Sequence, residues 1–90
     1  MSFTGMDIDA VQKLGHDLQA QATQIEHTIA AINQLAHHSQ DIWKGKDAVE
    51  FLGWWEQQHR PALQHVREAV AGLGQSALNN ASEQQNVSQH

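Results

Sequence analysis

Apolar and small residues recur along the first half of the chain in steps that alternate between three and four. This seam consists of Ile8, Val11, Gly15, Leu18, Ala22, Ile25, Ile29, Ile32 and Ala36. A heptad spacing sustained for about four heptads is typical of a long helix packed on another helix. Leu14 and Leu35 flank the seam and widen it, as in the helices of a bundle. Asp7 stands directly before the seam and is the expected N-cap, and Thr4 with Asp7 three residues later is an alternative capping box.

A turn signal ends this pattern near the middle of the chain. Trp43 falls in phase with the core side at the end of the expected helix. Gly45 stands where a helix commonly has a left-handed C-terminal residue, and Asp47 with Glu50 three residues later is suited to cap a second helix. The turn is therefore predicted over residues 44–47, which is short enough to make the two helices antiparallel.

A second helical pattern follows the turn. Its apolar side is expected to consist of Ala48, Phe51, Leu52, Trp55, Ala62, Val66, Ala69, Val70, Leu73 and Ala77. Pro61 lacks an amide hydrogen and clashes with the carbonyl four residues earlier, so a bend is expected over residues 57–61. The polar composition predicts a disordered tail over residues 79–90, and residues 1–6 are expected to form a flexible arm.

Together these patterns predict an all-α protein of one domain, an antiparallel hairpin of helices over residues 7–43 and 48–78. A lone hairpin in a chain of 90 residues buries little surface, and no Cys is present to staple it. Pairing of two hairpins into a four-helix bundle is the expected remedy. The residues expected in the hairpin core and dimer interface are Val11, Leu14, Leu18, Ile25, Ile29, Ile32, Leu35, Phe51, Leu52, Trp54, Trp55, Val66 and Leu73.

The aromatic residues around the turn suggest different roles. Phe51 and Trp55 are four residues apart and share a helix side, so both are expected to pack between the two helices. Trp54 points away from them and is expected to contact a partner subunit. For Trp43, two interpretations stay open: a ring that only caps the end of the core, and a recognition signal.

Charge and composition exclude several classes of function. The formal net charge is −5 at pH 7 with only five Lys and Arg, so neither nucleic-acid binding nor stable membrane insertion is expected. The chain has no apolar run of about 18 residues and does not begin like a secretory signal peptide. No nucleophile motif or phosphate-binding loop is present, so neither enzymatic activity nor a cofactor is expected.

Seven His residues raise the question of a metal site. No two of them stand three or four residues apart, the spacing that brings two ligands to one helix side, so no metal is expected. His16, His27 and His37 are expected on the solvated side of the first helix. His59 has two interpretations, a neutral hydrogen-bonded core residue and a pH-sensitive dimer contact.

The chain resembles the WXG family of small, early-secreted-antigen-like proteins of type VII (ESX) secretion systems. The resemblance covers nearly the whole chain and lies in its length, its two-helix pattern and a set of residues around the turn: Trp43, Lys44, Gly45, Asp47, Ala48, Phe51 and Trp55. It implies hairpins that pair as homo- or heterodimers. It also implies synthesis in the cytoplasm and export, folded and without a cleavable signal peptide, driven by a membrane ATPase.

The family has a second export signal, Tyr-Xaa-Xaa-Xaa-Asp/Glu, just past the second helix. This chain has no Tyr, and the nearest spacing is Asn79 with Glu83, a candidate tail element that keeps the acid and lacks the ring. A heterodimer in which the other subunit carries the Tyr motif reconciles this departure. In the family the two signals come together at one end of the bundle, each from a different subunit.

The function implied by the resemblance is that of a type VII substrate, or of a chaperone-like pairing partner for a co-secreted protein. Its own partner is then a second copy or a paralogous WXG-family protein. Two alternatives stay open, a membrane-active secreted effector and an intracellular helical adaptor. The scarcity of Lys and Arg argues against the first, and only the resemblance argues against the second.

Overall fold

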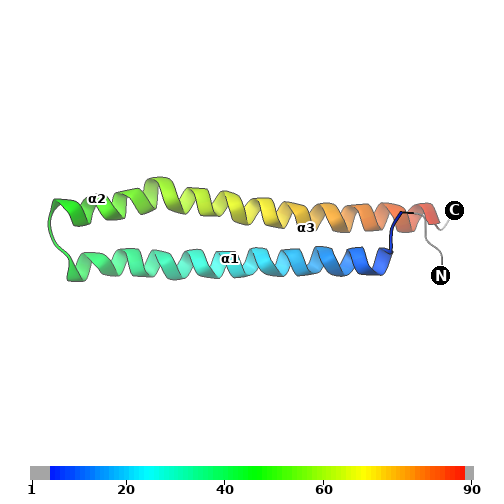
Figure 1. Cartoon of the computed structure of the whole chain (residues 1–90), viewed down its shortest axis with the longest axis horizontal. Coiled ribbons are helices and arrows are strands. Elements are labelled where there is room, and N and C mark those ends of the chain that lie inside the picture. The colour runs from blue at the N-terminus through cyan, green and yellow to red at the C-terminus, as the bar shows by residue number, and fades with distance from the viewer. Residues whose placement is uncertain (1–4, 89–90) are drawn as a thin grey trace.

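The computed structural model describes residues 5–88, and this range is almost entirely helical. Helix α1 spans Ile8–Ile42, and a second arm is formed by α2 (Lys46–Trp54), the π-helix η1 (Trp55–His59) and α3 (Arg60–Ser88). The two arms lie side by side and antiparallel as a rod of 67 × 16 × 15 Å (Figure 1). The predicted all-α helical hairpin is thereby confirmed. Residues 1–4 of the predicted arm and 89–90 of the predicted tail lie outside the described range.

Helix α1 follows its predicted start and seam. The Asp7 side chain accepts a hydrogen bond from the Ala10 N–H at 3.2 Å, which confirms Asp7 as the N-cap. The buried residues of α1 are spaced seven apart along the contact with the second arm: Gly15, Ala22, Ile29 and Ala36. A seam of mostly small residues lets the two arms approach closely.

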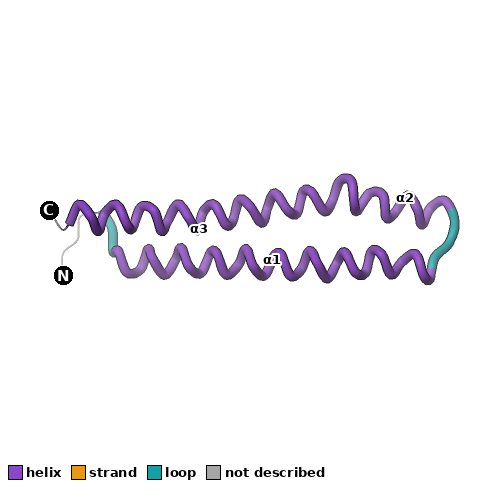
Figure 2. Tube along the Cα trace, turned by 180° about the vertical axis from the view of Figure 1, so that it is seen from behind, coloured by secondary structure: helices purple, strands orange, loops and turns teal. Residues whose placement is uncertain are grey.

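The turn, teal in Figure 2, lies between Ile42 and Lys46 and is shorter than predicted. Gly45 also has a different conformation from the expected one. Trp43 is already extended, whereas Gly45 has φ 112° and ψ −175°. This region is essentially restricted to glycine, but it is not the left-handed helical conformation. Helix α2 begins at Lys46 with Gly45 as its N-cap, so Asp47 as the cap was wrong. Asp47 instead lies in the first turn, where its charge favours the helix dipole.

The predicted bend before Pro61 is a π-turn. The N–H of Arg60 bonds to the carbonyl of Trp55, five residues earlier, instead of four as in an α-helix. The clash between a proline ring and the carbonyl four residues back gives a physical reason for a wider turn at this point. The second arm is therefore continuous but irregular at its π segment.

This π-turn also shifts the phase of the second arm. A regular heptad continued from Trp55 places His59, Val66 and Leu73 on the core side. The extra residue instead turns Gly74 and Ala81 toward α1, and both are buried. Val66 and Leu73, which were expected in the hairpin core and dimer interface, are both exposed and lie outside the core of the single hairpin.

Near the termini the two backbones touch. A Cβ atom on Gly74 would lie 2.8 Å from the carbonyl oxygen of Gly15, and one on Gly15 would lie 2.7 Å from the Leu78 side chain. Ala81, seven residues after Gly74, is 0% exposed. The seam thus continues past Leu78 and holds α3 helical to Ser88, so the disordered tail predicted from residue 79 was wrong up to that point.

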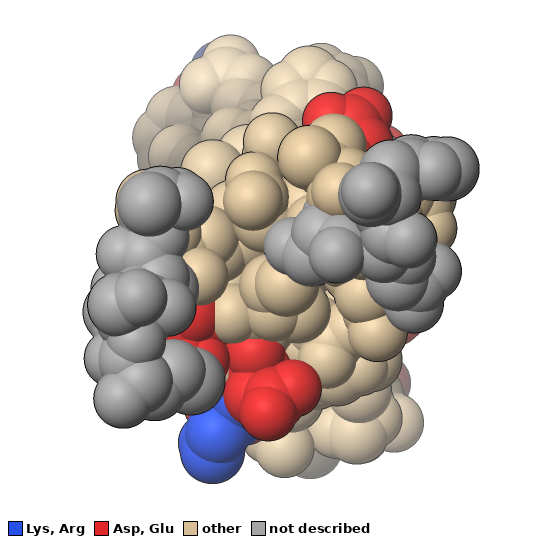
Figure 3. All heavy atoms as spheres, turned by 90° about the vertical axis from the view of Figure 1, so that its right-hand side faces the viewer, with Lys and Arg blue, Asp and Glu red and all other residues tan. Residues whose placement is uncertain are grey.

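Acidic groups gather at the end of the rod that carries the termini, which we call the open end. Asp7 and Asp9 lie at the start of α1, and Asp17 forms an exposed ion pair with Lys13 at 2.6 Å. Figure 3 looks onto this end, where acidic groups (red) cover more of the described surface than basic groups (blue). The opposite end of the rod carries the turn.

The core of the single hairpin is small. Ile29, Ala36 and Trp55 form a buried cluster, against which half-buried residues pack: Ile25, Ile32, Leu52 and Leu63. No large side chain among residues 5–88 is fully buried. Within the same range, no helix is both long and apolar enough to cross a membrane.

Candidate protein-interaction surface

One side of the hairpin near the turn carries a polar network. The Asn33 side-chain oxygen accepts two hydrogen bonds, from the Trp55 indole N–H at 2.9 Å and from the Arg60 guanidinium at 3.2 Å. Residues five apart point to different sides of a regular α-helix. The π-turn therefore brings Trp55 and Arg60 to one acceptor on α1.

Further polar contacts extend this network along the same side. The Glu56 carboxylate lies 2.8 Å from the His37 imidazole and 3.8 Å from Arg60. Gln40 donates to the backbone carbonyl of Ala48 at 2.8 Å. His37 was expected to be merely solvated, but it reaches across to the second arm. These contacts couple α1 to the second arm in the half of the rod nearest the turn.

The opposite side of the hairpin carries an apolar groove instead. Leu35 stands two residues from both Asn33 and His37, and residues two apart do not share a helix side. The groove has a volume of about 340 Å³ and is lined by Ile32, Leu35, Ala36, Ser39, Phe51, Trp54, Trp55 and His59. His59 is exposed at this groove, so the interpretation of His59 as a core residue was wrong.

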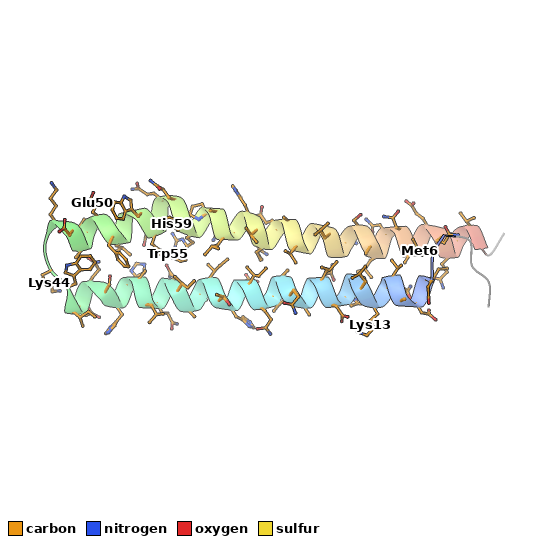
Figure 4. All side chains as sticks on the ribbon, viewed as in Figure 1. Met6, Lys13, Lys44, Glu50, Trp55 and His59 are labelled. Carbon is orange, nitrogen blue, oxygen red and sulfur yellow. The ribbon has the colours of Figure 1, made fainter. Side chains whose placement is uncertain are left out.

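The aromatic residues around the groove differ in burial. Trp55 is buried between the arms, as Figure 4 shows. Phe51 is 41% exposed and its ring centroid lies 5.4 Å from that of Trp43 at the end of α1, so it packs only partly between the arms. Trp54 is 51% exposed beside the groove. Contact between Trp54 and a partner subunit stays a prediction.

Exposed apolar side chains continue from the groove along the whole rod. On α1 these side chains are separated by multiples of seven residues. On the second arm, the π-turn determines which residues lie on this side. We call this set the apolar face; it consists of Leu14, Leu35, Ile42, Phe51, Trp54, Val66 and Leu73. An exposed set of large apolar side chains on one side of a protein is typical of a protein-interaction site.

The residues predicted for the core and interface therefore separate into three groups. Ile29 and Trp55 are buried. Half-buried residues flank the seam: Val11, Leu18, Ile25, Ile32 and Leu52. The exposed ones all belong to the apolar face: Leu14, Leu35, Phe51, Trp54, Val66 and Leu73.

The turn is accessible at the tip of the rod. Trp43 is 41% exposed, and both Lys44 and Gly45 are exposed. The Lys44 ammonium donates to the carbonyl of Gln40 at the end of α1, which satisfies one of the free carbonyls there. Figure 4 shows Lys44 at this tip, far from Met6 and Lys13 at the open end.

The candidate tail element lies on a helix, not on a flexible tail. Asn79 and Glu83 are exposed on α3, four residues apart and therefore on one helix side. The Asn79 side chain accepts a hydrogen bond from Gln75 at 2.9 Å. Both residues lie in the half of the rod away from the turn.

Sequence reasoning missed the polar network. A buried tryptophan N–H requires an acceptor, and this rule was the available signal for a polar partner of Trp55. It does not identify Asn33, because the phase of the second arm depends on the π-turn. Within residues 5–88, no three His, Asp or Glu side chains converge as a metal site.

The described surface therefore offers an apolar face and an exposed turn for binding. Compared with models of protein families, with curated proteins and with solved structures, the chain matches none of them.

Proposed function

We propose that this chain is a helical pairing subunit exported by a type VII (ESX-like) secretion system, as a substrate or as the partner of a co-secreted protein. In this proposal the apolar face binds the second subunit, and the turn supplies the Trp-Xaa-Gly half of a composite export signal. The membrane ATPase of the secretion system is the partner that recognises the assembled signal.

The observation that carries the proposal is the exposed turn at the tip of the hairpin. Trp43 keeps 41% of its surface exposed, and its backbone has left the helix. A tryptophan that served only to fill the core would bury its ring, as Trp55 does. Gly45 then reverses the chain through a conformation that other residues rarely adopt, so the ring and the turn are presented together.

The one-sided apolar face supports the pairing part of the proposal. Leu35, for example, is 68% exposed, and exposed large apolar side chains run from the turn to the open end. Covering them against a second hairpin completes a four-helix bundle. The polar network on the opposite side leaves that side suited to water.

This chain has no Tyr for the second export signal, Tyr-Xaa-Xaa-Xaa-Asp/Glu. That departure is consistent with a signal assembled from two subunits. Asn79 and Glu83 supply an acid at helical spacing but no ring. In the proposal, the Tyr motif that completes the signal beside this turn comes from the other subunit. A copy of this chain alone then exports poorly, and co-expression with that subunit restores export.

An immunoblot of cell pellet and culture filtrate, with and without a functional type VII ATPase, tests the proposal. A cytosolic marker controls for lysis. The expected result is protein in the filtrate only when the ATPase works. Protein confined to the pellet in both strains contradicts export and favours the intracellular adaptor.

A further inference from the structure

The groove near the turn is held open by contacts on the other side of the hairpin. The Trp55 ring lines it, and the indole N–H of Trp55 bonds to Asn33 at 2.9 Å in the polar network. Trp55 and His59 are the first and last residues of the π-helix, and π-helical turns are frequent at functional sites. A volume of about 340 Å³ between apolar and aromatic walls is within the range of small-molecule sites. The groove is therefore suited to a ligand with an apolar body.

Aromatic rings are concentrated around this groove. The chain has three Trp and two Phe, and three of these five residues line the groove: Phe51, Trp54 and Trp55. Phe51 is 41% exposed and Trp54 is 51% exposed, so a ligand in the groove can reach both rings. The faces of Trp and Phe rings attract cations, and quaternary ammonium groups are often bound in this way. The walls therefore favour a ligand that combines an apolar body with a positive charge.

An acidic residue stands beside these rings. Asp47 lies four residues before Phe51 and seven before Trp54, spacings that place all three on one side of the second arm. Asp47 is exposed, and none of the ion pairs formed within residues 5–88 involves it. Its carboxylate is therefore available to a cation at the end of the groove nearest the turn.

The basic residues of the turn do not cancel this charge. Lys44 bonds to the carbonyl of Gln40, whose side chain belongs to the polar network. Lys46 stands five residues before Phe51, and residues five apart point to different sides of an α-helix. His59 is the one titratable residue that lines the groove, and it lies eight residues beyond Phe51, away from the turn. The net charge of −5 also favours a cationic ligand over an anionic one.

We infer that the groove binds a free organic cation with one alkyl chain and a quaternary ammonium group. The ammonium lies over Phe51 and Trp54 near Asp47, and the chain extends along Leu35 and Ile32 of α1. This inference goes beyond the proposed function and does not depend on it. In the proposed function the second subunit covers the same groove, so the ligand binds the unpaired chain.

Titration of tryptophan fluorescence tests the inference, because Trp54 and Trp55 both line the groove. The purified full-length chain is titrated with octyltrimethylammonium and, separately, with octanoate, which has a similar chain and an anionic head group. Both probes stay below the concentrations at which they form micelles, and about pH 8 is used because imidazole is ordinarily neutral there. Saturable binding of the cation, at least about fivefold tighter than that of octanoate, is expected. Equal affinities, tighter binding of octanoate or the absence of saturation overturns the inference.

Two pairs of variants locate the bound cation. Asp47→Asn removes the charge beside the rings, and Asp9→Asn, at an acid in the first turn of α1, is its matched control. Trp54→Ala removes one wall, and Leu73→Ala, at an exposed residue of the apolar face outside the groove, is the second control. Circular dichroism confirms that each variant keeps the helix content of the natural chain.

Asp47→Asn and Trp54→Ala are each expected to weaken cation binding several-fold, whereas both controls bind like the natural chain. An equal loss in Leu73→Ala indicates general adsorption to the apolar face and overturns the site. Unchanged binding in Asp47→Asn and Trp54→Ala overturns it as well. None of these outcomes bears on export, which is measured separately in culture filtrate.

Discussion

The half of the hairpin nearest the turn and the half nearest the termini hold their helices together differently. Near the turn, the Trp55 ring separates the arms and its N–H bonds to Asn33. Near the termini, Gly15 and Gly74 bring the backbones into contact. A large buried ring leaves space beside it, whereas close backbones push larger side chains outward. The difference explains why the groove opens beside Trp55.

The largest expected change in the free energy of unfolding comes from a substitution in the half of the rod nearest the turn. Trp55→Ala lowers the free energy of unfolding by about 3–5 kcal/mol, because it empties the core cluster and removes the donor to Asn33. Chemical denaturation followed by circular dichroism measures the change in dilute protein. Trp54→Ala is the matched control, and it costs below about 1 kcal/mol because this ring is half exposed. Equal losses contradict the assignment of Trp55 as the core tryptophan.

In the half of the rod nearest the open end, the contact between Gly15 and Gly74 can be tested. Gly74→Ala places a Cβ 2.8 Å from the backbone oxygen of Gly15, so the arms must move apart, at a cost of about 2–3 kcal/mol. Gly72→Ala meets nothing within 4 Å and gains up to about 1 kcal/mol from helix propensity. Opposite signs for the two variants are expected in thermal unfolding. A neutral Gly74→Ala removes the proposed difference between the two halves.

The turn itself depends on one backbone conformation. Gly45→Ala meets no steric contact, yet φ 112° with ψ −175° disfavours any side chain, at a cost of about 1–2 kcal/mol. Gly53→Ala, inside α2 and also free of contacts, is expected to stabilise the helix slightly. The comparison is made by denaturant titration. Similar values for the two variants argue against a special conformation at Gly45.

The smallest stability effect is expected in the polar network. Asn33→Ala removes the acceptor shared by Trp55 and Arg60, and the expected cost is about 1 kcal/mol because the site is only partly buried. Gln34→Ala, its exposed neighbour, is expected to change little. Amide hydrogen exchange measures where the loss appears. Faster exchange is expected around the π segment, and uniform exchange along the rod contradicts a local role.

Sequence patterns predicted the features that depend on local chemistry. The seam of α1, the Asp7 cap, the central turn and an irregularity before Pro61 follow from spacing, capping and proline geometry. These features need little knowledge of the partner helix. The antiparallel hairpin follows from them, because a short turn leaves no other arrangement.

Apart from the Asp47 cap and the conformation of Gly45, the errors concern which side of a helix faces its neighbour, or packing between distant residues. One extra residue in the π-turn rotates the second arm after Trp55 about its axis, which places Val66 and Leu73 on the apolar face and His59 at the groove. The segment predicted as a disordered tail stays helical to Ser88. Its composition is polar, but Ala81 within it is buried against the hairpin and stabilises the helix. The spacing of Gly74, Leu78 and Ala81 was the available signal for this continuation.

In the proposed function, the exposed turn acts in export as well as in folding. Trp43→Ala is compared with Val49→Ala, an exposed apolar residue in α2, by immunoblot of culture filtrate and by thermal unfolding. Because the Trp43 ring is partly exposed, its removal is expected to cost no more than about 1–2 kcal/mol. Folded Trp43→Ala is expected to stay in the pellet, while Val49→Ala reaches the filtrate. Export of Trp43→Ala at the level of the natural chain contradicts a role of the turn in export.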